Sequence, residues 1–423
     1  MTDGELHFSA DSLLFDTVFT GISSPAAYLK VYNPHEQLLK ILEIKLIKGE
    51  GSPFQMNCNG TPGNSITNIE IPPRDSLFIF LKANIPPSDD KLLPAEDKIR
   101  FSVKNRDWDI YIAAFGQNVH ILNDSVIDSR SWTNKKSYLI YNRVVVKENE
   151  ILSVEEGTHI YFHRGAEMVV KGSIKVNGSY DHPVVFEGDR LNSHQSIFTE
   201  DSSLSYKNVA GQWAGITLDK DSRGNMFKNT TIKNAQVGIF ADSASSVFLY
   251  NVRISNHSFA GIYAEYAGIT AGNCLVHHCN ISGLRTNESH LCLYHCTFVG
   301  DQAEAVNLRG VSQEVKIHNS LITSADGTEA MKLSPENISA KISHSLITSD
   351  ALSLPYFFEC VNSAPLFVDI EKRNYNLQQN SPGKDIGSSQ FIDSLSGELK
   401  FDLNNRERAD GKPDAGVFEV VSE

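Results

Sequence analysis

The chain of 423 residues carries a formal net charge of −13, with 21% charged residues. This length predicts two domains, and an acidic chain without a basic stripe is a poor partner for nucleic acid. Because the sequence holds no apolar run of about eighteen residues, we predict no transmembrane segment.

Residues 1–125 show the pattern of an antiparallel β-sandwich. Short apolar strings alternate with turns rich in Gly, Pro and Asn. The strings are residues 13–15, 27–31, 42–47, 76–81, 99–103 and 110–115. The stretches 14–18 and 29–34, with 110–117 as a closing strand, resemble the immunoglobulin-like modules that precede repeat domains in bacterial surface proteins. We therefore expect an Ig-like β-sandwich here, and we find no catalytic cluster in it.

Residues 126–150 are expected to connect this sandwich to a second domain. Within that domain, an excursion of about 25 residues runs from Glu187 to Gln212 and leads directly into Trp213. Its polar residues include Asp189, Arg190, His194 and Asp201. Long excursions from a short-looped scaffold are often functional. Two interpretations stay open: a loop that borders a binding site, and a surface loop without a further role.

A pattern of one polar residue, followed three positions later by a large apolar one, recurs six times between residues 229 and 347. The pairs are Asn229-Ile232, Asn251-Ile254, Asn273-Val276, His295-Phe298, Asn319-Ile322 and His344-Ile347. Their steps are 22, 22, 22, 24 and 25 residues. This period, combined with short alternating apolar strings, predicts the stacked coils of a parallel β-helix. Its apolar members would form an interior column, and its polar members a ladder at an inward turn.

A second register pairs a small residue with an apolar one at nearly the same period. The pairs are Gly215-Ile216, Gly238-Ile239, Gly261-Ile262, Gly283-Leu284, Ala305-Val306 and Ala330-Met331. The apolar member should point inward, so the second and fourth residues after the small one should point outward. These two outward columns are Thr217, Phe240, Tyr263, Arg285, Asn307 and Lys332, and Asp219, Asp242, Glu265, Asn287, Arg309 and Ser334.

Four of the six cysteines lie among histidines in a line that is superficially like a zinc site. The segment contains Cys274, His277, His278, Cys279, His290, Cys292, His295 and Cys296. The repeat argues against convergence on one metal, because Cys274 and Cys296 are 22 residues apart and should stack in one inward column. We expect buried structural thiols, with a Cys274–Cys296 disulfide and a metal site as the alternatives.

Several segments resemble right-handed parallel β-helix proteins of the pectate-lyase-like superfold. They are residues 157–162, 168–178, 183–186 and 213–216, and the closing motifs 364–369, 375–378, 381–387 and 408–419. The resemblance implies an all-β chain in which residues 126–395 form a right-handed parallel β-helix of about ten coils, and 396–423 finish its end. It also implies a rigid extracellular or outer-membrane surface scaffold, often polysaccharide-directed, with a lipid anchor as one open possibility. The first residues lack the features of a signal peptide, so the chain is either cytosolic or a form from which an export signal was removed, and the resemblance favours the second.

The outward columns supply the candidate site. We predict that Trp213, Phe240, Tyr263 and Arg285 bind a ligand, because aromatic rings stack on sugars and guanidinium groups pair with carboxylates. The catalytic candidates are Asp219, Asp242, Glu265 and Arg285. Carboxylates stacked about 5 Å apart could hold Ca²⁺, which takes several oxygens; otherwise no metal or cofactor is expected. The alternative is a solvated strand face with ordinary cross-strand charge pairs.

Two functions therefore stay open. The first is a monomeric surface scaffold that binds a polysaccharide or another extracellular polymer without catalysis. The second is a polysaccharide lyase or glycoside hydrolase that acts on the outer face of the β-helix. The repeat region lacks the paired-Asp and Gly-His-Gly motifs of polygalacturonases and the Arg-x-x-Pro-x-x-Arg motif of pectate lyases, and the pair Asp89-Asp90 lies in the predicted sandwich. These absences favour the scaffold.

Overall fold

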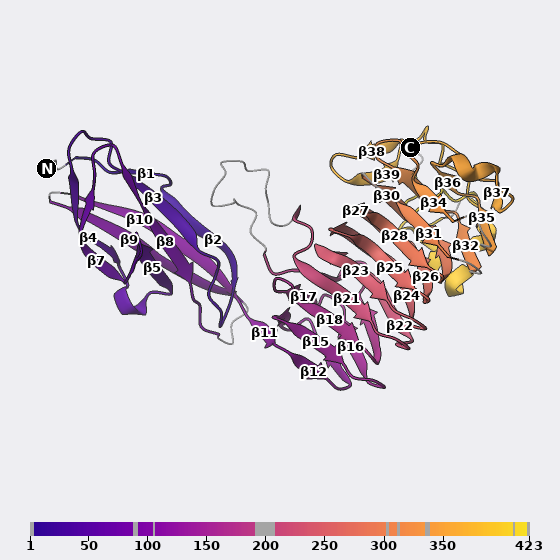
Figure 1. Cartoon of the computed structure of the whole chain (residues 1–423), viewed down its shortest axis with the longest axis horizontal. Coiled ribbons are helices and arrows are strands. Elements are labelled where there is room, and N and C mark those ends of the chain that lie inside the picture. The colour runs from indigo at the N-terminus through magenta and orange to yellow at the C-terminus, as the bar shows by residue number, and fades with distance from the viewer. Residues whose placement is uncertain are drawn as a thin grey trace. The chain divides into compact units, whose positions relative to one another are not determined.

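The computed structural model describes residues 4–87, 92–104, 106–190, 208–301, 304–310, 314–334, 339–408 and 411–420. Two compact units make up the chain, one over residues 1–119 and the other over residues 120–190 and 208–423 (Figure 1). The described residues form strands, turns and short 3-10 helices, with no α-helix among them. None of them forms a helix that is long and apolar enough to cross a membrane.

The first unit is a β-sandwich of two five-stranded sheets, as the sequence predicts, although the expected pairing was antiparallel and two of its strands pair in parallel. One sheet has the order β1 (His7–Phe8), β3 (Ala27–Tyr32), β8 (Ser76–Ala83), β5 (Phe54–Cys58) and β6 (Thr61–Pro62). The other has the order β2 (Ser12–Phe19), β10 (Arg106–Gln117), β9 (Leu92–Val103), β4 (Leu39–Leu46) and β7 (Ser65–Ile71). Alternate residues of these strands are buried, which closes a core between the sheets. The immunoglobulin-like character stays a prediction.

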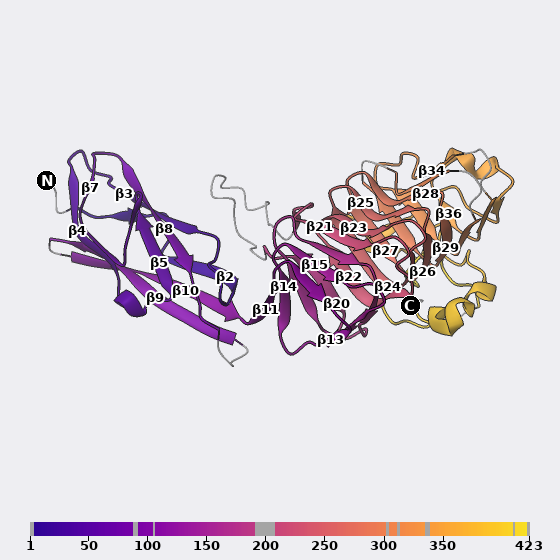
Figure 2. The ribbon, with the colours of Figure 1, turned by 60° about the horizontal axis from the view of Figure 1, so that its bottom comes forward.

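The second unit is a right-handed parallel β-helix of about nine turns, close to the ten expected (Figures 1 and 2). One wall is a nine-strand sheet of β12 (Ser125–Ile127), β15 (Arg143–Val146), β18 (Glu167–Val170), β21 (Trp213–Leu218), β23 (Ala235–Ala241), β25 (Ala260–Glu265), β28 (Ser282–Asn287), β31 (Val306–Arg309) and β34 (Met331–Leu333). Neighbouring strands of this sheet come from successive coils and pair in parallel.

The other walls belong to one eighteen-strand sheet that bends around the coil. Its strands are β11 (Val119–Leu122), β13 (Arg130–Trp132), β14 (Ser137–Ile140), β16 (Ile151–Glu155), β17 (His159–Phe162), β19 (Ser173–Asn177), β20 (Val184–Gly188), β22 (Asn225–Lys233), β24 (Ser246–His257), β26 (Gly268–Gly272), β27 (Leu275–Cys279), β29 (His290–Tyr294), β30 (Thr297–Gly300), β32 (Glu314–His318), β33 (Leu321–Ser324), β35 (Ser339–Ser343), β36 (Leu346–Ile347) and β37 (Phe357–Phe358). The coils thus begin before residue 126, and the last strand that joins this sheet ends at Phe358.

The interior columns confirm both sequence registers. Ile254 pairs with Ile232 on one side and with Val276 on the other, and Val276 pairs with Phe298. All four side chains are fully buried. The small-apolar register gives a second buried column from Ile216 through Ile239, Ile262, Leu284 and Val306 to Met331. Each coil therefore contributes to one continuous apolar core.

The polar ladder is confirmed, and its backbone explains which residues compose it. Asn229, Asn251, Asn273, His295, Asn319 and His344 all have positive φ, between 45° and 54°. Asn and His tolerate this left-handed conformation better than most residues, which is why they recur at the turn. Neighbouring rungs touch: Asn251 donates to Asn229 Oδ1 at 3.0 Å, and Asn319 lies 2.9 Å from His295 Nε2.

The residues that follow the ladder positions form a second column, and their shared role explains why Cys274 and Cys296 occur in it. In five of these six rungs the side chain of this residue donates a hydrogen bond to the carbonyl two residues earlier, and so caps the turn. These side chains are Thr230, Cys274, Cys296, Ser320 and Ser345. Cys274 and Cys296 are buried, free thiols in this column, as the first of the three interpretations expected. A thiol here replaces a hydroxyl, which is a structural role.

The end of the chain departs from expectation. Residues 396–423 were expected to finish the end of the β-helix, but the described part lies along its side. Lys228 pairs with Glu398 at 2.7 Å, Asn273 donates to Phe401 O at 2.6 Å, and Gly416 donates to Asn319 O at 2.8 Å. These partners belong to the ladder turn and its flanks, so the segment covers the ladder side chains rather than a terminal coil.

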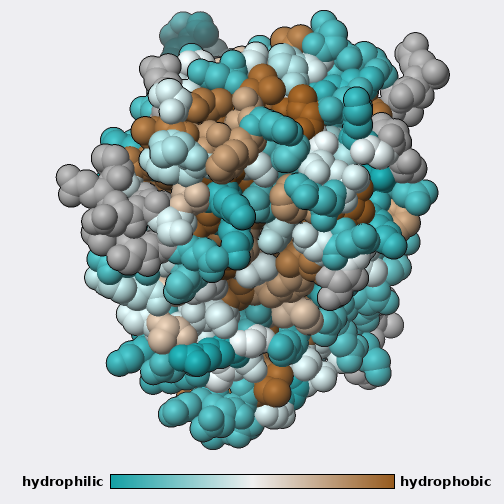
Figure 3. Space-filling model, turned by 90° about the vertical axis from the view of Figure 1, so that its right-hand side faces the viewer, coloured by the Kyte–Doolittle hydropathy of each residue, from teal (hydrophilic) through white to brown (hydrophobic). Residues whose placement is uncertain are grey.

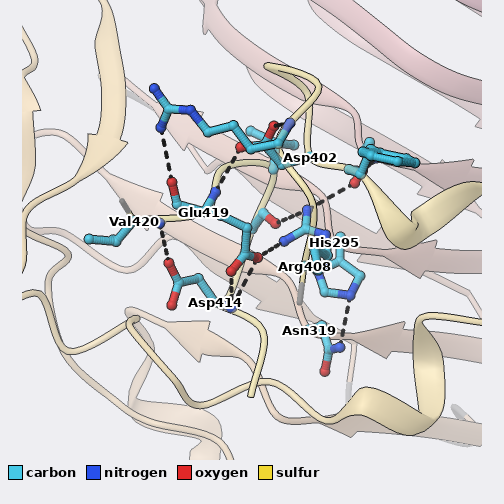
Figure 4. A network of polar contacts seen from close by, with 12 residues as sticks. His295, Asn319, Asp402, Arg408, Asp414, Glu419 and Val420 are labelled. Atoms are coloured by element: carbon cyan, nitrogen blue, oxygen red, sulfur yellow. Dashed lines mark hydrogen bonds and ion pairs between the residues drawn. The ribbon is translucent and has the colours of Figure 1, made fainter. Parts of the chain in front are cut away.

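The segment is anchored by Arg408, whose side chain is fully buried (Figure 4). Its guanidinium donates to Glu419, to Asn273 Oδ1 at 3.1 Å and to Gly416 O at 3.2 Å. Glu419 also accepts from the Asp414 backbone N–H, and its own N–H donates to Asp402 at 2.9 Å. This network gives the buried guanidinium several partners, as a buried ion requires, although the Nε of Arg408 has no partner within the described chain.

The terminal coil is closed by side chains of the last turn instead. Leu352, Phe357 and Cys360 are partly buried against the interior column. Figure 3 views the molecule from the side on which β35 and β37 lie in Figure 1, and it shows apolar residues scattered among mostly hydrophilic ones. Exposed Phe358 and Val368 belong to this part of the chain.

The ladder turn generates a stability prediction. At Asn251 we expect Ala to cost about 1 kcal/mol more than Gly, because both remove the bond to Asn229 but only Ala strains the left-handed backbone. The midpoint of urea unfolding of the full chain, followed by circular dichroism, measures the difference. Equal midpoints for the two variants would contradict this account of the ladder.

Buried His257 generates a pH prediction. Burial lowers its pKa from 6.5 to about 4, while its ring accepts from the Ala235 N–H at 3.2 Å. The folded protein therefore binds this proton less tightly than the unfolded chain, and stability present above pH 6.5 is lost as the pH falls toward 4. Between neutral pH and about pH 5 we expect His257→Gln to lose about 2 kcal/mol less unfolding free energy than the parent. Parallel pH curves would show that His257 does not titrate in this way.

Candidate functional site

The candidate site lies on the outer face of the nine-strand sheet, where consecutive coils place equivalent residues in register. Phe240 pairs with Thr217 on one side and with Tyr263 on the other, and Tyr263 pairs with Arg285. Their inward neighbours Ile239 and Ile262 are buried, while these side chains are half-buried on the outside. The first four members of this predicted outward column are therefore assembled as expected, whereas Asn307, which pairs with Arg285, is buried.

A hollow of about 290 Å³ opens on this face. Its lining residues are Ala214, Gly215, Ile216, Thr217, Val237, Phe240, Phe259 and Tyr263. Three aromatic rings form its walls: the centroid of Tyr263 lies 5.3 Å from that of Phe240 and 5.8 Å from that of Phe259. An apolar hollow with aromatic walls is the kind of surface on which a flat or ring-shaped ligand packs.

Gly215 shapes one wall of this hollow. Its φ is +136°, and a Cβ built on it would lie 1.9 Å from the carbonyl oxygen of Val237. The strand pairing shifts by one residue between Gly215 and Ile216, which marks a β-bulge. Only glycine satisfies both constraints, so the bulge and the close approach explain this residue.

The bulge overturns one predicted site residue. Trp213 was expected on the outer face, but the shifted register pairs it with Ala235 and turns its side chain into the core. It is fully buried, stacks on Phe162 with ring centroids 3.8 Å apart, and donates from Nε1 to Lys233 O at 2.9 Å. A one-residue shift exchanges the inward and outward faces of a strand. Trp213 is therefore a core residue.

Phe259 takes the place that the prediction gave to Trp213. It lies two residues before Gly261, as Trp213 lies two residues before Gly215, but it is half-buried and reaches the hollow. The guanidinium carbon of Arg285 lies 5.9 Å from its ring centroid. The sequence shows the same spacing for both residues. It does not show the bulge at Gly215, which turns Trp213 inward, whereas Phe259 stays on the outer face.

Polar groups border the aromatic rings on one side. The hydroxyl of Tyr263 donates to Glu265, whose neighbour in the next coil is Asn287. Burial, together with the bond to Glu265 and its charge, raises the pKa of Tyr263. A carboxylate, a phenol and a guanidinium thus lie at the edge of the hollow, where they can exchange hydrogen bonds with a polar ligand.

The three predicted acids do not converge on one another. Asp219 lies beside Lys171 with 4.0 Å between its oxygen and the ammonium nitrogen. Asp242 accepts from the Ser243 N–H at 2.6 Å, and Glu265 accepts from Tyr263. Each carboxylate has its own local partner. Within the described ranges, the structure shows no group of three His, Cys, Asp or Glu side chains placed to hold a metal ion, and this column is not an exception.

Both ends of the excursion from Glu187 to Gln212 are bonded to neighbouring coils, while residues 191–207 lie outside the described part of the chain. Asp189 lies 2.6 Å from His163 Nδ1, and the Gln212 N–H donates to Asn234 O at 2.7 Å. Burial raises the pKa of Asp189, and the bond to His163 opposes that rise. The role of the central residues of the excursion stays a prediction.

The family comparison agrees with this architecture. Residues 197–363 match the model of the family described as "Right handed beta helix region". A GH87 α-1,3-glucanase from Streptomyces thermodiastaticus is 10% identical, with a TM-score of 0.26 over 80% of this chain and 77% of that chain. A family 123 glycoside hydrolase from Clostridium perfringens, studied for glycolipid glycan hydrolysis, is 7% identical, with a TM-score of 0.20 over 29% of this chain and 30% of that chain.

These two likenesses are too distant to carry a functional argument. The search of curated proteins gives no match. The family match covers the coils that build the outer face, and the two interior columns show why the coils stack. The second unit of this chain is therefore a right-handed parallel β-helix, and it follows a β-sandwich.

The corrected position of Trp213 can be tested against Phe259. We expect Trp213→Ala to lower the free energy of unfolding by about 3–5 kcal/mol, because it leaves a cavity beside Phe162. We expect Phe259→Ala to cost only about 1 kcal/mol, because its ring is half-exposed. Chemical unfolding of the two variants measures both values. A Trp213→Ala variant as stable as the parent would contradict the buried position of Trp213.

Proposed function

We propose that the second unit binds a carbohydrate polymer on the outer face of its nine-strand sheet. The observation that carries this proposal is the hollow walled by Phe240, Phe259 and Tyr263, with Glu265 and Arg285 at its border. Sugar rings have apolar faces and polar edges. Aromatic walls next to a carboxylate and a guanidinium complement both parts of such a ligand.

The site extends along the axis of the β-helix, which suits a long ligand. Its residues come from successive coils, which are spaced by about 4.8 Å along the helix axis. A polymer that lies along this axis would meet Phe240, Tyr263 and Arg285 in turn. Such a ligand fits the extracellular or surface location that the resemblance implies.

Binding without catalysis is the version we favour. A glycosidase needs two carboxyl groups on opposite sides of one bond, at a separation of about 5–10 Å. Here Asp219, Asp242 and Glu265 lie in one column on one face, and each is engaged with a local partner. Lyase or hydrolase activity with these acids and Arg285 stays the alternative, and the experiment below separates it from binding.

The full chain should be retarded in affinity gels that contain a polysaccharide, tested with polygalacturonate, alginate, dextran and laminarin. On a glycan that retards the parent, we expect Tyr263→Ala and Phe240→Ala each to weaken binding by about tenfold, since each removes a stacking platform. Tyr180→Ala is the matched control, because Tyr180 is an exposed tyrosine outside the hollow.

Each outcome decides between the hypotheses. Retardation that the Tyr263 and Phe240 variants retain in full would contradict the proposed site. Unsaturated products or new reducing ends from the parent, lost in Glu265→Gln or Asp242→Asn, would establish the catalytic alternative. No retardation by any of the four glycans would count against carbohydrate binding on this face.

A further inference from the structure

The first unit carries a second aromatic surface on the sheet that contains β3 and β8. Strand alternation places Tyr28, Lys30 and Tyr32 of β3, and Phe78 and Phe80 of β8, on the outer face of this sheet. Lys30 pairs directly with Phe78, and Tyr28 with Phe80. We call these five residues the sandwich patch. Their inward neighbours Leu29, Val31 and Ile79 fill the core of the sandwich.

The rings of the sandwich patch form one surface. The Phe78 and Phe80 rings are nearly parallel, at 18° with centroids 6.2 Å apart, and the Tyr28 centroid lies 5.8 Å from that of Phe78. Phe78 and Phe80 are each 38% exposed and Tyr32 is 37% exposed. Nine aromatic residues are exposed across the described chain, and three of them lie here. Such a concentration is characteristic of a binding surface.

A cation lies among these rings. The Lys30 ammonium is 4.7 Å from the Tyr32 centroid and 5.4 Å from the Phe78 centroid, which is cation–π distance. Lys82, exposed on the same strand as Phe80, extends the positive charge. Over residues 4–87, 92–104 and the later described ranges, neither lysine forms an ion pair with a carboxylate.

Basic residues of the opposite sheet of the sandwich differ from Lys30 and Lys82, because they form ion pairs with carboxylates. There Lys45 pairs with Glu43 at 2.6 Å, and Arg100 pairs with Asp109 at 2.8 Å. The chain as a whole carries a net charge of −13. The sandwich patch is therefore a local positive surface with aromatic rings on an acidic protein. Charge complementarity favours an anionic partner for it.

We propose that the sandwich patch is a second carbohydrate site, which binds a polysaccharide that carries carboxylate groups. The rings of Phe78 and Phe80 would stack on the faces of sugar rings, and Lys30 and Lys82 would pair with the carboxylates. The exposed amide of Gln55, which lies opposite Lys82, can bond hydroxyl groups. This proposal does not depend on the hollow of the nine-strand sheet, since the two surfaces belong to different units.

The test uses the full chain with Tyr263→Ala, which weakens binding at the hollow, so that a further loss of binding in the variants below reports on the first unit. The probes are polygalacturonate, alginate and hyaluronate, with methyl-esterified polygalacturonate as the uncharged counterpart. We expect the Phe78→Ala, Phe80→Ala double variant to bind the acidic glycan about tenfold more weakly. We expect Lys30→Gln to bind it about threefold more weakly and with less dependence on salt. Retardation by the methyl ester should be weaker than by polygalacturonate.

The matched control is the Tyr111→Ala, Phe115→Ala double variant, which removes two exposed rings from the other sheet. It should bind like the Tyr263→Ala parent. The proposal is wrong if the Phe78, Phe80 variant binds all three acidic glycans like this parent, or if the parent binds none of them. It is also wrong if that variant changes only the sedimentation of the protein, since the patch would then join copies of the chain. Circular dichroism confirms that each variant is folded, and Lys30→Gln tests the patch without removing a ring.

Discussion

Hydrogen bonding between parallel strands of successive coils is the constraint on which the second unit depends. Because each coil pairs residue by residue with the next, a position that is inward in one coil is inward in all of them. The fold therefore constrains whole columns of equivalent residues rather than single positions. The left-handed turn shows this most clearly, since Asn or His fills it in six consecutive coils.

The same constraint produces the candidate site. A strand face in one coil offers a single ring, but stacking places Phe240 and Tyr263 side by side without any loop to support them. Among the described strand pairs of the nine-strand sheet, the pairing register shifts at Gly215, and this bulge coincides with the hollow. Bulges are common beside binding sites because they redirect side chains. Here the bulge sends Trp213 inward and leaves open space beside Thr217.

Periodicity made the columns predictable from sequence. Equal spacing was sufficient to place Ile232 inside, Tyr263 outside and Asn251 at the turn, because each belongs to a repeated class. What sequence could not give are the features that occur once. The bulge at Gly215 breaks the register in a single coil, so Trp213 was assigned to the wrong face. The path of residues 396–408 depends on contacts with residues more than a hundred positions away, such as Asn273, and no local pattern encodes them.

The position of the C-terminal segment has a consequence for the cooperativity of the fold. In a solenoid each coil contacts only its neighbours, so it behaves as a one-dimensional array whose ends can fray independently. This segment connects Lys228, Asn273 and Asn319, which belong to coils that are not adjacent. It therefore couples coils that are not neighbours in the array. Because the segment follows these coils in the chain, the ribosome synthesises it after them, and the ladder side chains that it covers are exposed to solvent until it docks.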